Sequence, residues 1–481
     1  MSASPPAPKS WRVAIVGGGL AGLAAVHRLH ELCAREQRPH EFVLFEAGSR
    51  LGGIVGTRSI DGYRVELGAD SFITNKPWGV DLCRRLGIDG RLIPTNAQYR
   101  RSLVLRNGTP VPVPDGFQLL APVSIGAVLG SPIFSWPGKL RMACEYFVPR
   151  SKSNGDESLA AFVRRRLGQE ALERLVQPLV GGIYTSDPEK LSLRATMPRF
   201  LEMEQAHGSL IRALRWQQQA GRGNDATASG ARYGLFTTPA GGISELVDAL
   251  AVKVTEQAEV RCETEVQGLA RAPDGRGFIV SLAGEKLESF DAVVLAVPAF
   301  RAARLITGFA SSAGDKLSSI EYASTAVVVS GHKLADIRHP LEAFGLVVPA
   351  IEKRGILAVS FTSRKFPGRA PDGCVQLRTF VGGAMQPELM ELTDEEIMAL
   401  VRQELEDILG VTWKPDFAIV ARWMRSMPQY HVGHLDLIAS IERELSGTPN
   451  LALAGHAYNG VGIPDTIHSG EVAAERVFAS M

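Results

Sequence analysis

The sequence has few cysteines and no excess of charge of one sign. Its 481 residues include five cysteines, none of them in a C-x-x-C pair, so we expect neither a disulfide framework nor a metal site. Lysine plus arginine number 52 against 51 aspartate plus glutamate, a net charge of +1 that predicts no nucleic acid as a partner. The scattered cysteines fit a reducing compartment, so we expect a cytoplasmic protein.

We also expect neither a leader nor a segment that spans a membrane. Residues 1–10 are rich in proline, serine and alanine and have no apolar core, so we expect neither a signal peptide nor an anchor. Residues 116–138 carry no charge, but Pro122, Pro132 and Pro137 would break a spanning helix. This run predicts a buried or interfacial helical segment with peripheral membrane contact.

The composition is that of an ordinary globular protein, and the chain is too long to fold around a single hydrophobic core. Hydrophobic residues make up 45% and charged residues 21% of the 481 residues, so we expect two or more domains. Residues 158–167 and 169–177 have helical apolar spacing, and Arg164–Arg166 are predicted to form a solvated helix face. Residues 217–234 are polar and rich in small residues, which predicts an exposed linker.

A glycine motif near the start predicts a dinucleotide site. Gly17, Gly19 and Gly22 form a G-x-G-x-x-G between an apolar strand and a helix reaching about Cys33, and Glu46 ends the next apolar strand. These glycines allow a tight turn, close approach of a pyrophosphate and packing of helix on strand. The helix N-terminus favours the negative charge, and Glu46 is placed to accept hydrogen bonds from ribose hydroxyls.

Strand patterns far along the chain predict that this nucleotide domain is discontinuous. Residues 260–266, 277–282 and 290–297 each read as a strand, and the last is a buried apolar run. A helix is expected after the glycine turn in residues 237–250. Residues 451–465 repeat the strand, glycine turn and helix pattern near the C-terminus, so a second helix N-terminus is expected to offer backbone amides and a positive dipole end.

Three segments resemble the flavin amine oxidase superfamily. They are Glu46-x-x-x-Arg50-x-Gly52-Gly53, residues 65–72 and residues 451–465. A closer resemblance, to the oxygen-dependent protoporphyrinogen/coproporphyrinogen oxidases, rests on six segments in the right order: residues 106–114, 177–192, 344–349, 365–371, 378–383 and 423–434.

That resemblance implies a mixed α/β fold with three parts. It implies a discontinuous Rossmann-type FAD domain over residues 11–87, 236–300 and 421–481. It also implies a mixed-sheet substrate domain over 88–100 and 301–420, and a helical, membrane-facing domain over 101–235. A homodimer is a further expectation of the family.

The resemblance also implies the cofactor and the residues that hold it. FAD is expected to be noncovalent, because no cysteine has the context of a flavin attachment site. The FAD-binding residues are predicted to be Gly17, Gly18, Gly19, Leu20, Ala21, Gly22, Glu46, Ala47, Arg50, Gly53, Gly68, Ala69, Asp70, Ser71, Val266, Trp423, Gly455, Gly460, Val461, Gly462 and Ile463.

For the substrate, the resemblance implies a porphyrinogen that is oxidised by six electrons at the flavin, with O₂ as acceptor and H₂O₂ as product. Arg101, or Arg100 beside it, is expected to pair with a propionate. Val347 and Phe380 are expected to clamp the macrocycle, with Gly182 close to its pyrroles. Because the flavin performs the hydride transfer, no catalytic side chain is predicted.

Several alternatives stay open. Ser360 stands where related enzymes often have a bulky apolar residue, which leaves the shape of the clamp undecided. Protoporphyrinogen IX and coproporphyrinogen III are both candidate substrates. His456 is expected near the flavin, while His431, His434 and His468 have no metal-ligand spacing. An amine oxidase, a carotenoid-type desaturase or a cofactor-free relative that binds small GTPases are the competing functions.

Overall fold

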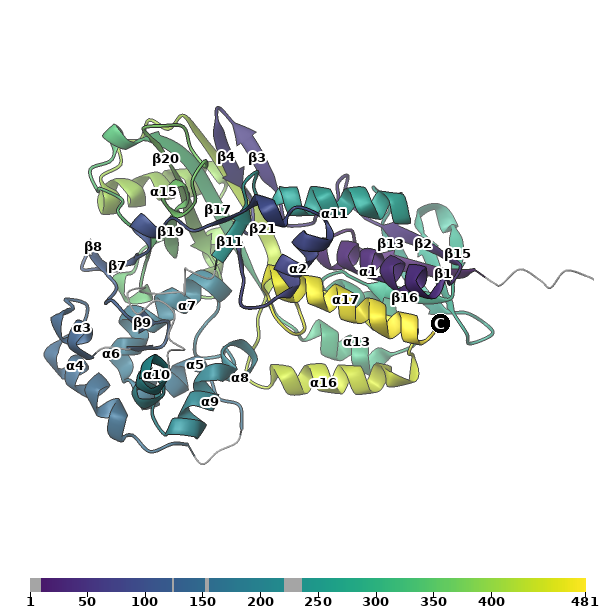
Figure 1. Cartoon of the computed structure of the whole chain (residues 1–481), viewed down its shortest axis with the longest axis horizontal. Coiled ribbons are helices and arrows are strands. Elements are labelled where there is room, and N and C mark those ends of the chain that lie inside the picture. Colours follow the sequence, from purple (N-terminus) through teal and green to yellow (C-terminus); the bar gives the residue numbers. More distant parts are fainter. Residues whose placement is uncertain (1–9, 123–124, 152–154, 220–235) are drawn as a thin grey trace, which may run out of the picture.

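The fold combines two large sheets with a separate group of helices (Figure 1). The computed structural model describes residues 10–122, 125–151, 155–219 and 236–481. In Figure 1 the helical region lies at the lower left, the seven-stranded sheet at the upper left and the five-stranded sheet with its helices at the right. Residues 1–9 and most of the linker predicted for 217–234 lie outside the described residues.

The five-stranded sheet is parallel throughout and is assembled from distant parts of the chain. Its order is β12-β2-β1-β16-β22. The strands are β1 (Trp11–Val16), β2 (His40–Phe45), β12 (Glu259–Arg261), β16 (Ala292–Leu295) and β22 (Leu451–Leu453). The strand, helix and strand predicted around the glycine motif are therefore present, and the sheet is completed by residues from the middle and the end of the chain.

Helices cover one face of this sheet, and helices with a small sheet cover the other. On one face α1, α2, α11 and α17 share one apolar core: α1 (Leu20–Glu36), α2 (Trp78–Arg85), α11 (Ser244–Gln257) and α17 (Ile463–Ala479). On the other face the core is shared by α12 (Ala299–Ile306), α13 (Ser311–Ser318), α16 (His434–Glu444) and the antiparallel strands β13 (Val266–Arg271), β14 (Phe278–Leu282) and β15 (Leu287–Phe290). Both faces are buried, as a parallel sheet requires.

The single strand predicted over residues 260–266 is wrong. The chain leaves the parallel sheet after Arg261, and Val266 begins β13 in the small antiparallel sheet. Glu263 between them has a positive φ of 52°, and its N–H donates to the carbonyl of Gly48 at 2.9 Å. This backbone contact with the segment that follows β2 turns the chain. It involves no apolar side chain, so the apolar periodicity of the sequence does not reveal it.

The seven-stranded sheet is mixed and has the order β21-β17-β20-β19-β18-β7-β8. Its strands are β7 (Ser102–Arg106), β8 (Thr109–Pro112), β17 (Tyr322–Lys333), β18 (Gly345–Val347), β19 (Ala358–Phe361), β20 (Cys374–Gly382) and β21 (Phe417–Pro428). Helix α15 (Asp394–Leu409) packs on one face, and Thr393 and Glu396 form a capping box at its start.

Three predicted domain boundaries differ from the sheet pairings. Strands β7 and β8 belong to the seven-stranded sheet and not to the helical part predicted over 101–235. Strand β21 also belongs to that sheet, although residues 421–481 were expected in the FAD domain. Strand β6 (Leu92–Pro94), expected in the substrate domain, pairs instead with β11 (Phe236–Pro239), which also pairs with β5 (Phe72–Ile73). Strand pairing is long-range, so local patterns do not reveal it.

One further hairpin and the helical region complete the fold. The hairpin is β3 (Thr57–Ile60) with β4 (Tyr63–Glu66). The helical region has its own apolar core. It consists of α3 (Ile125–Gly130), α4 (Trp136–Ala143), α5 (Leu159–Arg166), α6 (Gln169–Ala171), a π-helical turn (Leu172–Val176), α7 (Gln177–Tyr184), α8 (Leu193–Thr196), α9 (Pro198–His207), α10 (Leu210–Gln219) and the short pair β9 (Phe117–Gln118) and β10 (Ala121–Pro122).

The uncharged run over residues 116–138 is not one helical segment. Within the described residues it holds the β9–β10 pair, α3 and the first turn of α4. Ser135 caps α4 by accepting the N–H of Gly138 at 3.2 Å. Among all described helices, none has both the length and the apolar character needed to cross a bilayer.

The solvated face predicted for Arg164–Arg166 is wrong for Arg166. Its side chain is 0% exposed and forms ion pairs with Glu145 and Glu204, both of which are equally buried. Its guanidinium also donates to the carbonyls of Val148 and Gly208, each at 3.0 Å. Sequence spacing places three arginines on one short helix, but only tertiary packing brings carboxylates to one of them.

His332 in β17 makes the stability of the seven-stranded sheet depend on pH. Burial lowers the pKa of this fully buried ring to about 4, below its usual 6.5. The unfolded chain therefore binds the proton first, and stability is lost as the pH falls below 6.5. Relative to His332→Phe, the wild type should lose about 2 kcal/mol more between pH 7 and pH 5. Urea unfolding of both proteins at pH 7 and pH 5 measures the two losses of stability. Equal losses in the wild type and in His332→Phe would contradict the prediction.

Candidate functional site

A cavity of about 980 Å³ connects the two large sheets and helix α7. Its lining includes most of the residues predicted to bind FAD: Gly17, Gly19, Leu20, Ala21, Glu46, Ala47, Gly53, Gly68, Ala69, Asp70, Ser71, Val266, Trp423, Gly455, Val461, Gly462 and Ile463. The predicted substrate residues Gly182, Val347 and Phe380 line the same cavity. The volume is at the upper end of the roughly 300–1,000 Å³ range of ligand sites, which suits a cofactor together with a substrate.

The glycine turn presents the N-terminus of α1 to this cavity. Gly17 has a φ of 108°, and an added Cβ would collide with the carbonyl of Ala296 in the next strand. Gly19 has no atom within 4 Å of its Cβ position, so its backbone is open to a ligand. Gly22 does not line the cavity, because it lies against the carbonyl of Gly17 and lets α1 approach β1. This geometry suits a pyrophosphate.

Glu46 is held at the end of β2 by two backbone groups. Its Oε2 accepts the N–H of Gly18 and its Oε1 accepts the N–H of Gly48, both at 2.7 Å. A carboxylate has about four acceptor sites, so Glu46 keeps capacity for two ribose hydroxyls. Gly18 is outside the cavity lining and acts by positioning this carboxylate.

Two more predicted residues shape the cavity without lining it. The Arg50 guanidinium donates to the carbonyls of Gly53 at 2.7 Å and Val55 at 3.0 Å, and so braces a loop that does line the cavity. Gly460 has a φ of 147° and donates its N–H to the Tyr430 hydroxyl at 2.8 Å. Both residues set the backbone of segments that face a ligand.

Asp70 forms a buried cluster with two cations that the sequence analysis did not select. Lys365, at the end of α14 (Thr362–Lys365), lies 3.0 Å from Asp70 Oδ1, and Arg378 of β20 lies 3.2 Å from Oδ2. Burial alone would raise the pKa of Asp70, but Lys365 and then Arg378 outweigh it and hold the pKa far below its usual range. Arg378 also donates to the carbonyl of Gly68. The carboxylate is therefore charged and the Gly68–Ser71 loop is braced.

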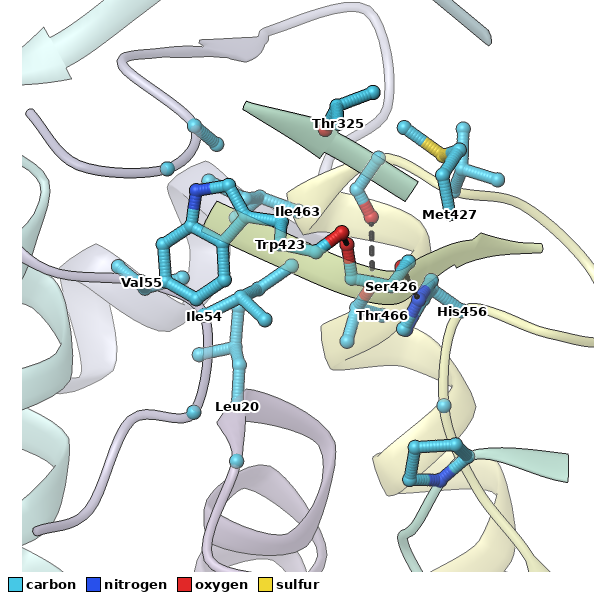
Figure 2. Close-up of a pocket in the computed structure, with 18 of the residues that line it drawn as sticks. Leu20, Ile54, Val55, Thr325, Trp423, Ser426, Met427, His456, Ile463 and Thr466 are labelled. Carbon is cyan, nitrogen blue, oxygen red and sulfur yellow. Dashed lines mark hydrogen bonds between the residues drawn. The ribbon is translucent and has the colours of Figure 1, made fainter. Parts of the chain in front are cut away.

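The C-terminal part of the chain lines the cavity with the N-terminal end of α17 and with the rings of Trp423 and His456. Figure 2 shows Trp423 beside Ile54 and Val55, with Ser426 and His456 together on the other side. His456 Nε2 lies 2.9 Å from the carbonyl of Ser426, so Nε2 carries the hydrogen of the neutral ring. Burial lowers the pKa of His456, which favours that neutral form. The expectation that His456 lies in the flavin cavity agrees with this position.

The cavity lining does not support the prediction of Arg101 or Arg100 as the substrate cation. Neither residue lines the cavity; Arg101 is exposed and a guanidinium nitrogen of Arg100 is 3.4 Å from the carbonyl of Thr95. Side chains alternate along a strand, and Ser102 at the start of β7 faces the cavity instead. The cations that do line it are Lys365, Arg378, Arg301 and Arg304.

Little in the sequence indicates that these four cations line the cavity. Arg301 and Arg304 lie on α12, directly after the buried strand β16, where a cation facing the nucleotide end could have been suspected. Lys365 and Arg378 begin two of the segments that carry the family resemblance. Their position beside Asp70 depends on contacts across some 300 residues of sequence.

Comparison with known proteins agrees with this site. The family model described as flavin containing amine oxidoreductase matches residues 20–478. The chain belongs to this family. A flavin is therefore its cofactor, and the predictions of FAD and of a flavin-dependent oxidoreductase are confirmed. That each predicted residue contacts FAD stays a prediction, which the shared cavity supports.

Individual relatives of this flavoprotein are similar over nearly its whole length. The coproporphyrinogen III oxidase of Bacillus subtilis is 34% identical, covering 96% of both chains. The protoporphyrinogen oxidase 2 of Arabidopsis thaliana is 27% identical, covering 97% of this chain and 94% of the relative. A solved structure from Exiguobacterium sp. 255-15, assigned as a protoporphyrinogen oxidase, has a TM-score of 0.86 at 29% identity and covers 99% of this chain and 100% of its own. The resemblance to this group is confirmed.

Proposed function

We propose that this flavoprotein oxidises a porphyrinogen to a porphyrin, with O₂ as the electron acceptor. The observation that carries the proposal is a single cavity in which the flavin-type segments continue into an apolar-walled space between α7 and the seven-stranded sheet. Full-length similarity to coproporphyrinogen III oxidases and protoporphyrinogen oxidases supports the same substrate class. Protoporphyrinogen IX and coproporphyrinogen III are both candidates.

The residues of the chain bind and orient the substrate in this proposal. Bound FAD supplies a two-electron hydride acceptor that O₂ reoxidises, so one porphyrinogen and three O₂ yield one porphyrin and three H₂O₂. Val347 and Phe380 supply apolar surface, and Gly182 of α7 lies across from Val347, with its Cβ position at an ordinary contact distance of 3.9 Å from a Val347 methyl group. A shaped, largely apolar cavity excludes water and holds the macrocycle against the cofactor.

The amine oxidase alternative fits the cavity less well. Within the described part of the chain, four basic side chains line the cavity against three acidic ones. Of the acids, Asp70 is paired with Lys365 and Arg378, and Glu265 is paired with Arg301 at 2.7 Å. Glu46 is held by backbone N–H groups at the nucleotide end. A cationic amine would therefore meet no unpaired carboxylate at the substrate end.

Direct turnover tests the proposed function. Yellow holoprotein is mixed without oxygen with coproporphyrinogen III, protoporphyrinogen IX or an alkyl amine, and the flavin absorbance is followed. We expect a porphyrinogen to bleach the flavin, and oxygen to restore it with porphyrin fluorescence and three H₂O₂ per porphyrin. Bleaching by the amine alone, or by none of the three, would overturn the proposal.

Peripheral membrane contact is part of the proposal and concerns the helical region. Trp136 and Leu140 lie one turn apart on α4 and are 72% and 68% exposed, and Phe147 beyond it is 79% exposed. Exposed aromatic and aliphatic side chains of this kind insert into the headgroup region of a bilayer. Co-sedimentation with lipid vesicles should fall for Trp136→Ser/Leu140→Ser, and equal sedimentation of both proteins would contradict membrane contact.

The remaining expectations are a cytoplasmic location, a homodimer and noncovalent FAD. Cys262, which directly follows β12, is half-buried and does not line the cavity, which supports noncovalent binding. Acid precipitation should release the flavin into the supernatant, and light scattering of the holoprotein reports the oligomeric state.

A further inference from the structure

The cavity-facing side of the seven-stranded sheet has two rows of side chains with opposite character. Strand register places Val327 opposite Phe380, Phe380 opposite Ala358 and Ala358 opposite Val347, which is an apolar row across four strands. The next row places Arg378 opposite Ser360, Ser360 opposite Gly345 and Gly345 opposite Ser102. All residues of both rows line the cavity.

The second row is polar and ends in positive charge. Arg378 stands at one end of it, and Lys365 lies in the same cluster through the shared carboxylate of Asp70. Two cations against one carboxylate leave a net positive charge at the cavity wall. Arg378 has five N–H donors and Lys365 has three, which exceeds what the two oxygens of Asp70 require.

We propose that this polar row is a subsite for a carboxylate of the substrate. Lys365 and Arg378 supply the charge, and the hydroxyls of Ser360 and Ser102 supply further hydrogen bonds. The apolar row of Val327, Phe380, Ala358 and Val347 takes the face of the ring system. The inference rests on the proposed function, and it replaces Arg101 by residues that face the cavity.

The row arrangement matches the shape of an amphipathic macrocycle. Neighbouring strands are about 4.8 Å apart, so each row extends along the sheet for more than ten ångströms, comparable to a tetrapyrrole. Carboxylates project from the rim of such a ring and not from its faces. A wall with an apolar row beside a charged row therefore orients the ring as well as binding it.

The other explanation is that the Asp70 cluster only braces the Gly68–Ser71 loop against the flavin. Lys365 donates to Ser71 Oγ at 3.0 Å, and Arg378 donates to the carbonyl of Gly68, as a brace would require. The two explanations differ in which ligand is lost. A brace affects FAD, whereas a subsite affects only substrates that carry a free carboxylate.

The test compares Lys365→Met holoenzyme with wild type on a porphyrinogen that has free carboxylates and on its fully methylated ester. We expect KM for the acid to rise roughly 10- to 100-fold with kcat within about twofold, as loss of a charge-assisted hydrogen bond predicts. Because Lys365 also contacts the Gly68–Ser71 loop, both substrates are measured at saturating FAD, and we expect KM for the ester to change much less than KM for the acid. Lys365→Arg should restore the KM for the acid, and Lys353→Met, an exposed lysine outside the cavity, is the matched control.

Different results overturn different statements. An equal rise in KM for acid and ester, or a loss of FAD with no change in KM, would show a brace and overturn the subsite. Activity of the wild type on neither porphyrinogen would overturn the proposed function itself. If Lys365→Met does not fold, Ser360→Val alters the row without touching the Asp70 cluster, and an unchanged KM for the acid would overturn the subsite.

Discussion

Gly22→Ala should lose most of the bound FAD and unfold at markedly lower urea. An added Cβ at residue 22 would collide with the carbonyl of Gly17 and lie 3.3 Å from Cβ of Ala296. Both neighbours are held in the parallel sheet, so α1 must move away from β1. We expect a loss of about 3 kcal/mol in the free energy of unfolding, the upper end of typical overpacking costs. Flavin absorbance per protein and urea unfolding measure the two effects.

Gly19→Ala is the matched control for this prediction. Gly19 caps α1 with a φ of −72°, which alanine adopts without strain, and no atom lies within 4 Å of its Cβ position. With FAD removed from both proteins, we expect its urea midpoint to equal that of the wild type, even where the methyl group weakens FAD binding by narrowing the cavity. A similar loss of stability in both variants would show that close packing at residue 22 is not the cause.

Arg166→Met should destabilise the helical region by about 3–5 kcal/mol, because it leaves two buried carboxylates with less compensation. Arg166 Nε donates to Glu145 at 2.8 Å, and the guanidinium also pairs with Glu204. Among the described residues, Glu145 would retain the hydroxyl of Ser209 and the N–H groups of Leu210 and Ile211. Urea unfolding followed by far-UV circular dichroism measures the loss.

Arg164→Met, two residues earlier on the same helix, supplies the control. Its side chain is 42% exposed and pairs with Glu189, which is 54% exposed. Exposed ion pairs contribute little, so we expect a change below about 1 kcal/mol. An equal loss of stability in both variants would contradict this explanation. The loss would then follow the removal of any arginine charge and not the burial of the Arg166 ion pairs.

Much of the site was predictable because its signals are local. The G-x-G-x-x-G turn depends on backbone freedom at Gly17 and on the absence of a side chain at Gly22. Both glycines lie in one short stretch of sequence, so the pattern can be recognised without the structure. Glu46 follows a strand whose length is set by its own apolar residues. The structure accordingly brings three predicted segments, near residues 17–22, 46–53 and 455–463, to one cavity.

The substrate end was less predictable because it depends on strand register. Arg101 and Ser102 are neighbours, and only the pairing of β7 with β18 decides which of them faces the cavity. The same holds for Arg378 and Ser360, which are opposite each other in β20 and β19 although 18 positions separate them in the sequence. A periodicity of two identifies alternating faces but not which face is inside.

The sequence by itself therefore determined the dinucleotide-binding turn and the discontinuous parallel sheet, because short glycine spacings and apolar runs act through local backbone geometry. It indicated the family and FAD through the resemblance of its motifs. Only the tertiary structure decided that Arg166 is buried, that Arg101 does not line the cavity and that Lys365 and Arg378 share Asp70. The place of Arg101 depends on strand register, and the other two outcomes depend on which distant residues supply a compensating charge. Charge compensation is a property of packed neighbours, and no local pattern encodes it.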